Sequence, residues 1–172
     1  MAEANGTKPT IGGKTSQVDA ARPGYLRAVA AGRMQVPPNC DLTLGMVCHD
    51  KSEPGRTVWR MAADERFCNP AGVLQGGFLA AFCDSAMGAS SVTWARGRKV
   101  RSANAELKIS FFAPVRPGGS LTVTAQVVAG GERVAFVEAE VVAEDGRPVA
   151  RASSTYILAP RAAPENDEER RG

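Results

Sequence analysis

The sequence predicts an α+β domain built from one long helix and an antiparallel sheet of about six strands. Four segments in the second half of the chain alternate apolar and polar residues, which is the period of a half-buried strand. A proline-free stretch from about 75 to 95 carries apolar residues at helical spacing. Two shorter strand-like segments precede it. A sheet with one apolar face and a helix with an apolar stripe must bury these surfaces against each other.

Strands are expected both before and after the helix in the sequence. Asp41 to Cys48 alternates, and Thr57 to Ala63 follows it after the turn residues Pro54-Gly55. After the helix, turns such as Gly130-Gly131 separate the four alternating segments, which are 105–112, 121–129, 134–143 and 148–158.

The length of 172 residues and the hydrophobic content of 44% suit one domain with a buried core. We expect this domain at 21–160, beginning with a short helix after Pro23. Residues 1–20 hold few large apolar side chains and 161–172 are nearly all charged or small, so we expect a disordered arm and a disordered tail. The net charge of +3 is too small to indicate a nucleic-acid partner.

The four cysteines, Cys40, Cys48, Cys68 and Cys83, include no CxxC pair, and His49 is the single histidine. We therefore expect no metal site and interpret the cysteines as buried thiols in a reducing compartment. Residues 1–20 contain no apolar segment typical of a signal peptide. No run approaches the roughly 18 apolar residues that span a bilayer. We expect a cytoplasmic protein without a membrane partner.

One motif leads into the predicted helix: residues 69–84 read N-P-A-G-V-L-Q-G-G-F-L-A-A-F-C-D. With the order of the elements, this motif resembles the PaaI-type branch of the hotdog-fold acyl-CoA thioesterases, over about Leu42 to Leu158. In that family a sheet wraps a central helix, and the motif runs approximately N-x-x-G-x-x-H-G-G with an acidic residue later in the helix. The resemblance implies hydrolysis of an aryl- or medium-chain acyl-CoA to free acid and CoA, without a cofactor.

The resemblance assigns the chemistry to Asn69, Gly76 and Asp84, and the residue types suit these roles. Gly76 lies where the helix is expected to begin, so its backbone N–H is free to meet the oxygen of an attacked carbonyl. Asp84 could attack the carbonyl or deprotonate a water, and both remain open. The amide of Asn69 can hold a carbonyl or a water. Gly77, next to Gly76, allows close approach of a substrate.

The sequence departs from the family at two positions. Gln75 replaces the family's histidine; it can donate a hydrogen bond to substrate but cannot titrate near neutral pH. Asn104, with Ser102 close by, stands on a strand where relatives often carry a serine or threonine that helps to position the water.

Three basic residues are candidate ligands for the phosphates of CoA. Arg98 and Lys99 belong to the run WARGRKVR after the helix, and Arg133 follows the Gly130-Gly131 hairpin. A solvated loop is the alternative interpretation of the basic run.

A non-catalytic acyl-CoA-binding protein is the main alternative function, because the family's histidine is missing. A hotdog dehydratase is a third hypothesis, although that chemistry usually pairs an acid with a histidine. No GxSxG, GxGxxG or P-loop motif indicates another enzyme class. The resemblance also implies a homodimer or homotetramer, in which each site combines the asparagine–glycine loop of one subunit with the aspartate of another.

Overall fold

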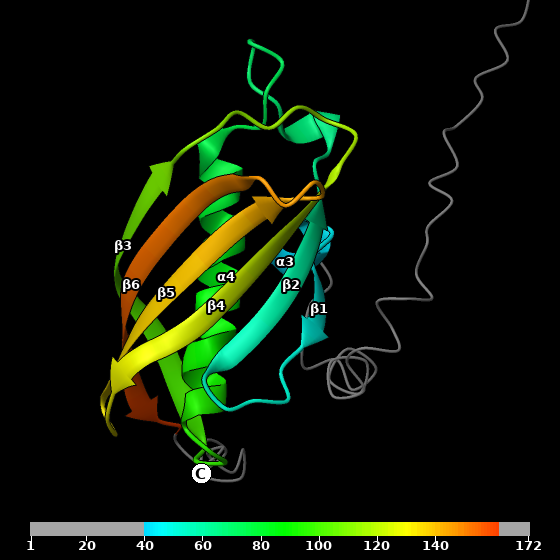
Figure 1. The fold of residues 1–172 in the computed structure, drawn as a ribbon. Helices are drawn as coiled ribbons and strands as arrows, with labels where there is room; N and C mark the ends of the chain where they lie inside the picture. Colours follow the sequence, from blue (N-terminus) through cyan, green and yellow to red (C-terminus); the bar gives the residue numbers. More distant parts are fainter. Residues whose placement is uncertain (1–39, 162–172) are drawn as a thin grey trace, which may run out of the picture. The chain divides into compact units, whose positions relative to one another are not determined.

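The computed structural model describes residues 40–161. The predicted arm at 1–20, the helix after Pro23 and the tail beyond Arg161 lie outside the described residues. In chain order the elements are α3 (Cys40–Thr43), β1 (Val47–Asp50), β2 (Arg56–Ala62), the 3-10 turn η1 (Glu65–Phe67), α4 (Gly76–Trp94), β3 (Val100–Phe111), β4 (Ser120–Gly130), β5 (Val134–Ala143) and β6 (Pro148–Pro160) (Figure 1).

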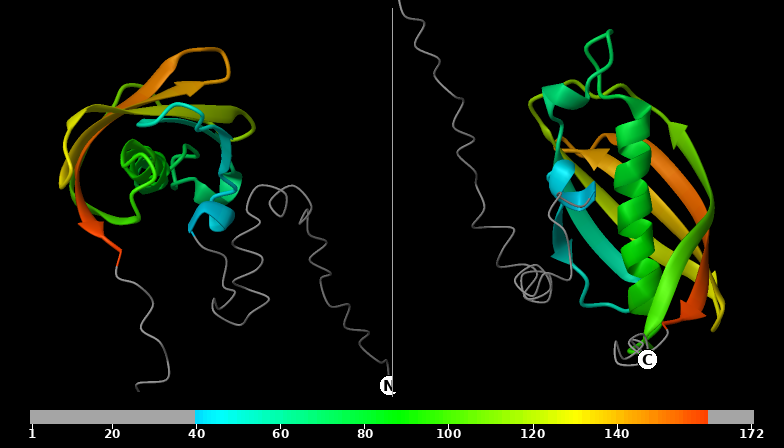
Figure 2. Two further views of the ribbon diagram at one scale, coloured as in Figure 1. Left: turned by 90° about the horizontal axis from the view of Figure 1, so that it is seen from below. Right: turned by 180° about the vertical axis from the view of Figure 1, so that it is seen from behind.

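The strands form one antiparallel six-stranded sheet in the order β1-β2-β4-β5-β6-β3. β3, the first strand after the helix, lies at the far edge and pairs with β6. The sheet curves around α4, and no described strand covers the opposite side of that helix (Figure 2). This arrangement confirms the predicted α+β class and the hotdog fold.

The helix α4 packs against β2, β3, β4, β5 and β6. Its residues with little exposure are mostly apolar or small: Leu79, Phe82, Cys83, Ala86, Met87, Ser90 and Ser91. The inner face of the sheet supplies branched and large apolar side chains, among them Met61, Leu121, Val123, Val137, Val141 and Val149. Small residues on the helix let the curved sheet approach it from several sides. The predicted helix at about 75–95 therefore agrees with the structure to within one residue at each end.

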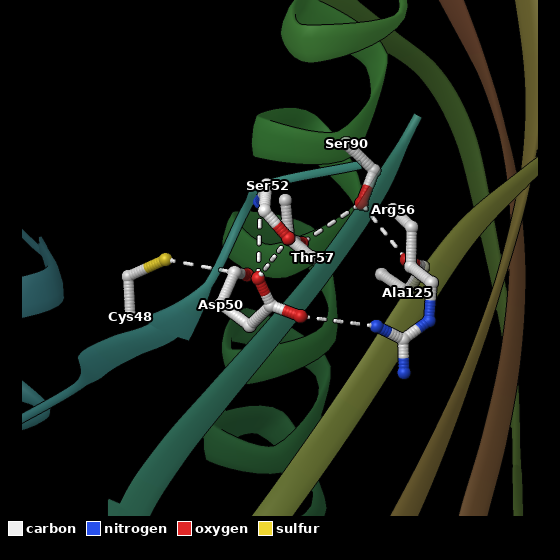
Figure 3. A network of polar contacts seen from close by, with 7 residues as sticks. All are labelled: Cys48, Asp50, Ser52, Arg56, Thr57, Ser90 and Ala125. Atoms are coloured by element: carbon white, nitrogen blue, oxygen red, sulfur yellow. Dashed lines mark hydrogen bonds and ion pairs between the residues drawn. The ribbon is translucent and has the colours of Figure 1, made fainter. Parts of the chain in front are cut away.

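Buried hydroxyl groups also join α4 to the sheet (Figure 3). Thr57 Oγ1 on β2 donates to Ala86 O at 2.9 Å and lies 2.8 Å from Ser90 Oγ. Ser90 Oγ also lies 3.1 Å from Ala125 O on β4. Because buried hydroxyl groups need partners, this network fixes the helix against β2 and β4.

The predicted strand from Asp41 to Cys48 is wrong in its first half, which forms α3, so that β1 is shorter than expected. Gly45 ends this helix with a φ of 64°, a left-handed conformation that favours glycine. Gly45 N–H donates to Leu42 O at 3.1 Å, and Met46 N–H donates to Asp41 O at 2.8 Å. These two bonds form a common helix end, which an alternation of apolar residues does not reveal.

The interpretation of four buried thiols is also wrong for three of them. Of the four cysteines only Cys83 is buried, while Cys48 and Cys68 are partly exposed and Cys40 is exposed. Cys83 lies on the central helix, whereas the others lie on or beside short segments at the margin of the fold.

Candidate active site

Asp84 is the only charged residue of α4, and its side chain reaches the edge of the sheet formed by β6 and β3. One carboxylate oxygen, Oδ1, accepts hydrogen bonds from two side chains. Tyr156 Oη on β6 and Asn104 Nδ2 on β3 each lie 2.6 Å from it. Hydrogen bonds of this length to a charged acceptor are among the stronger ones in proteins.

A bulge in β3 places Asn104 at this site. The register between β3 and β6 shifts between Asn104 and Glu106, so that one extra residue lies on β3. Asn104 is directly opposite Tyr156 in the register, and both side chains therefore lie on the face toward α4. Ser154 lies on the same face of β6, with its Oγ 3.2 Å from Asn104 Oδ1 and 2.7 Å from Glu106 O.

Tyr156, which is 3% exposed, is not among the residues predicted from the sequence. Burial and then the hydrogen bond and charge of Asp84 raise the pKa of its phenol far above the usual value. One feature of the sequence could have indicated this contact: a tyrosine stands among the inward-facing residues of β6. A buried tyrosine hydroxyl usually finds a polar partner.

The start of α4 offers free backbone donors. Gln75 is the N-cap and makes no side-chain capping bond. Within residues 40–161, no acceptor pairs with the N–H of Gly76 or Gly77, which are in the first turn of the helix. Gly76 also lies against the ring of Phe111, because an added Cβ there would be 2.9 Å from a ring carbon. A larger residue at this position would have to displace that ring.

Asn69 organises the loop that precedes the helix. Its Oδ1 accepts from Ala71 N at 3.0 Å and from Val73 N at 3.4 Å, while its own N–H donates to Val73 O at 2.8 Å. The side-chain oxygen is thus used by the loop. The amide Nδ2 is the part of Asn69 that remains for a donor role.

The structure does not bring the predicted residues together within one subunit. Eight residues of helix separate Gly76 from Asp84, which is about 12 Å along the helix axis. One carbonyl group is too small to contact both. Within the chain the predicted residues therefore fall into two separate groups: Asn69, Gln75, Gly76 and Gly77 near the helix start, and Asp84 with Asn104 in its middle.

The three predicted phosphate ligands do lie together. Arg98, Lys99 and Arg133 line a cavity of about 250 Å³ beyond the end of α4, between the start of β3 and the β4–β5 hairpin. Arg98 donates from Nη1 to Glu132 O at 3.0 Å and from Nε to Ala95 O at 3.3 Å, so it joins the helix end to the hairpin. Lys99 and Arg133 form no ion pair with another described residue.

Two further findings concern residues 40–161 alone. They contain no group of three or more His, Cys, Asp or Glu side chains that could hold a metal ion. They also contain no helix with the length and apolar character needed to cross a bilayer.

Comparisons with known proteins identify similar thioesterases and esterases. The sequence model of a family described as "Thioesterase superfamily" matches residues 71–150. A Saccharolobus solfataricus protein named "Putative esterase SSO2140" is 34% identical over 107 residues, which are 62% of this chain and 74% of that protein. Human acyl-coenzyme A thioesterase 13 is 24% identical over 70% of this chain and 85% of its own length.

A solved structure with the same fold is a variant of the phenylacetic acid degradation protein PaaI from Thermus thermophilus. It superposes with a TM-score of 0.62 and is 28% identical, covering 68% of this chain and 96% of that protein.

Proposed function

The chain belongs to the thioesterase superfamily, and we propose that it hydrolyses acyl-CoA with Asp84 as the catalytic carboxylate and Gly76 N–H as the oxyanion donor. The enzyme class follows from the family. The observation that carries the residue assignment is the carboxylate in the middle of α4, with Oδ1 engaged by Tyr156 and Asn104. A carboxylate oriented in this way on the central helix is suited to attack or to proton abstraction.

The chemistry follows from these groups. Attack on the thioester carbonyl places negative charge on its oxygen, and the free N–H of Gly76 with the positive end of the helix dipole stabilises that charge. Asp84 either forms an acyl-carboxylate anhydride, which water then hydrolyses, or takes a proton from the attacking water. In both routes the C–S bond breaks and the CoA thiolate accepts a proton, which gives a free acid and CoA.

We propose that the site is completed by a second copy of the chain. About 12 Å of helix separates Gly76 from Asp84, so these residues must act on one carbonyl from different subunits. β3 provides a surface for such pairing: it is 12 residues long, lies at the sheet edge and is largely exposed. Exposed edge strands pair readily with other strands. A twofold dimer joined at β3, itself able to pair into a tetramer, is the assembly that we propose.

The cavity lined by Arg98, Lys99 and Arg133 is the proposed site for the phosphates of CoA. Its position favours this role. Arg98 contacts Ala95 at the end of α4, and Ala95 lies eleven residues beyond Asp84, or about 16 Å along the helix axis. Phosphates in this cavity would therefore lie well away from a thioester group at Asp84. Lys99 and Arg133 are free to form charge-assisted hydrogen bonds to phosphate. Arg98, which already holds two backbone carbonyl groups, is better placed to fix the shape of the cavity.

The acyl group is proposed to be aryl or medium-chain. This choice rests on the resemblance to PaaI-type thioesterases and on the similarity to the Thermus thermophilus protein, which is named for phenylacetic acid degradation. A panel of acyl-CoA substrates with colorimetric detection of the released thiol tests it. We expect the highest kcat/KM with phenylacetyl-type or medium-chain esters, and a preference for long chains would contradict the proposed class.

The substitution Asp84→Asn tests the catalytic assignment. It keeps the shape of the side chain and removes its charge, so kcat should fall about 10²–10⁴-fold, the usual contribution of an acid–base group. Binding of acyl-CoA should be retained, because CoA is itself anionic. Gln75→Ala should cost much less, since Gly76 donates through its backbone.

Asp145→Asn is the matched control, because it makes the same chemical change in an exposed turn between β5 and β6. It should leave kcat unchanged. A wild-type protein that binds acyl-CoA tightly but hydrolyses no ester of the panel would instead favour the non-catalytic acyl-CoA-binding protein.

A further inference from the structure

The carboxylate of Asp84 is bound asymmetrically. Oδ1 accepts from both Tyr156 Oη and Asn104 Nδ2 at 2.6 Å, whereas no donor within residues 40–161 contacts Oδ2. An ionised carboxylate can accept about four hydrogen bonds over its two oxygens. The described contacts therefore use one oxygen and leave the other available.

The protons in these contacts can be placed from the distances. Asn104 must turn its NH₂ group toward Asp84, because two acceptor oxygens would repel each other at 2.6 Å. Ser154 Oγ lies 3.2 Å from Asn104 Oδ1, on the side where the amide oxygen then lies. Tyr156 Oη is 2.6 Å from Asp84 Oδ1 and 2.9 Å from Asp84 O, so its single proton has its shorter contact with the carboxylate.

The tyrosine is packed between β6 and α4. It belongs to the inner face of β6, is 3% exposed and lies against Gly88 on α4, where an added Cβ would be 3.6 Å from the ring. Burial and the nearby Asp84 raise the pKa of the phenol, which therefore stays protonated and remains a donor at neutral pH. Asn104, by contrast, lies on the exposed edge strand.

We propose that Tyr156 is a positioning residue for Asp84: together with Asn104 it fixes Oδ1 and thereby makes Oδ2 the reactive oxygen. The inference rests on the proposed role of Asp84 and extends it. It also changes the role of Asn104, whose amide orients the carboxylate instead of the water. The attack or proton transfer then always proceeds from one oxygen in one orientation, which lowers the entropic cost of reaching the transition state.

The test is a double-mutant cycle with Tyr156→Phe and Asp84→Asn. Tyr156→Phe removes only the hydroxyl, and we expect kcat to fall about 10- to 100-fold with KM nearly unchanged, because a charge-assisted hydrogen bond to the reacting group is lost. In the Asp84→Asn background the same change should alter kcat by less than about twofold, because no charged group remains to be oriented. Single-turnover measurements with enzyme in excess bring the slow variants within range.

Thr57→Val is the matched control. It also removes a buried hydroxyl that donates to α4, at Ala86 O, but it does not contact Asp84. It should lower the melting temperature and leave kcat within about twofold. If Tyr156→Phe is too unstable to purify, Asn104→Leu removes the other donor to Oδ1 at an exposed position, and the same cycle applies.

The outcomes separate the two proposals. The positioning role is overturned if Tyr156→Phe keeps the wild-type kcat, or if it lowers kcat equally in the wild-type and Asp84→Asn backgrounds. The proposed function still stands in that case, provided that Asp84→Asn alone is slow. A full rate in Asp84→Asn overturns the catalytic assignment, and the positioning role falls with it.

Discussion

At the scale of single residues, two titratable side chains beside Asp84 are kept neutral by the fold. Burial, followed by the charge of Asp84, raises the pKa of the Cys83 thiol from 9.0 to about 12. The pKa of the Tyr156 phenol, whose ordinary value is 10.0, is raised by burial and by the same carboxylate. Cys83 is therefore a poor nucleophile at neutral pH, although it adjoins the proposed catalytic residue.

These shifts predict a loss of stability in alkali. A group whose pKa is raised by folding contributes stability that is complete below its unfolded pKa and is lost as the pH rises toward its folded pKa. For Cys83 this window runs from 9.0 to about 12, and the free energy of unfolding should fall by about 1.4 kcal/mol per pH unit within it. Tyr156 adds to the loss above pH 10.0.

Urea unfolding followed by tryptophan fluorescence, from about pH 8, which is below this window, to about pH 11, which is within it, measures the effect. Cys83→Ala and Tyr156→Phe should each make the dependence on pH less steep. Thr57→Val removes no titratable group, so it should lower stability by the same amount at every pH. A slope that is unchanged in both Cys83→Ala and Tyr156→Phe would contradict the assignment.

At the scale of secondary-structure elements, the basic cavity depends on the meeting of segments that are distant in sequence. The segment between α4 and β3 supplies Arg98 and Lys99, and the β4–β5 hairpin supplies Arg133. β6 closes the same region, because Leu158 N–H donates to Arg133 O at 2.8 Å. The hairpin is thus fixed to the sheet, which holds the backbone of Arg133 in place while its side chain remains exposed.

We predict that Arg133→Ala raises KM for acyl-CoA about 5- to 50-fold and leaves kcat nearly unchanged, because a phosphate contact stabilises the ground state and the transition state equally. Arg116→Ala is the matched control. It removes one positive charge from the loop between β3 and β4, at a different cavity, and should leave KM unchanged.

Steady-state kinetics should be measured with CoA esters and with short thioesters that lack the nucleotide. Arg133→Ala should slow only the CoA esters. Equal effects on both substrates would show that Arg133 acts through the structure of the hairpin.

At the scale of the whole molecule, the separation of about 12 Å between Gly76 and Asp84 along the helix axis is the reason for the proposed assembly. β3 lies at the sheet edge, and in the proposed dimer each copy contributes one part to each of two sites. In a twofold dimer the same surface of each subunit meets the other, so one pairing completes two sites at once. A stable and active monomer in light scattering would contradict this account.

Complementation between two inactive variants tests the shared site. Asn69→Ala damages the loop and Asp84→Asn removes the carboxylate, but a heterodimer of the two retains one site with both native parts. Random mixing gives heterodimers in half of the dimers, so about a quarter of wild-type activity should return. Refolding the two variants together, with each refolded alone as the control, measures this. No gain on mixing would indicate that each site is formed within one subunit.

Much of the fold could be predicted from local patterns. Alternation of apolar residues located β4, β5 and β6, and the proline-free run of small residues located α4, because these periods follow directly from strand and helix geometry. The exception was Asp41 to Cys48, where the alternation hid a helix ended by Gly45. Leu44 and Met46 are buried in the structure, as they would be in the predicted strand, so their burial alone does not distinguish the helix from the strand.

The sequence by itself determined the family and the central helix, and it made Asp84 the candidate catalytic residue, since these depend on residue order and spacing within one continuous segment. Only the tertiary structure decided what surrounds that carboxylate. Tyr156 lies 72 residues away and reaches Asp84 from the inner face of β6, while a bulge in β3 places Asn104, and neither contact leaves a local signal. The helix also separates Gly76 from Asp84 by its fixed rise per residue, so residues that share one motif lie too far apart to share one site within a single subunit.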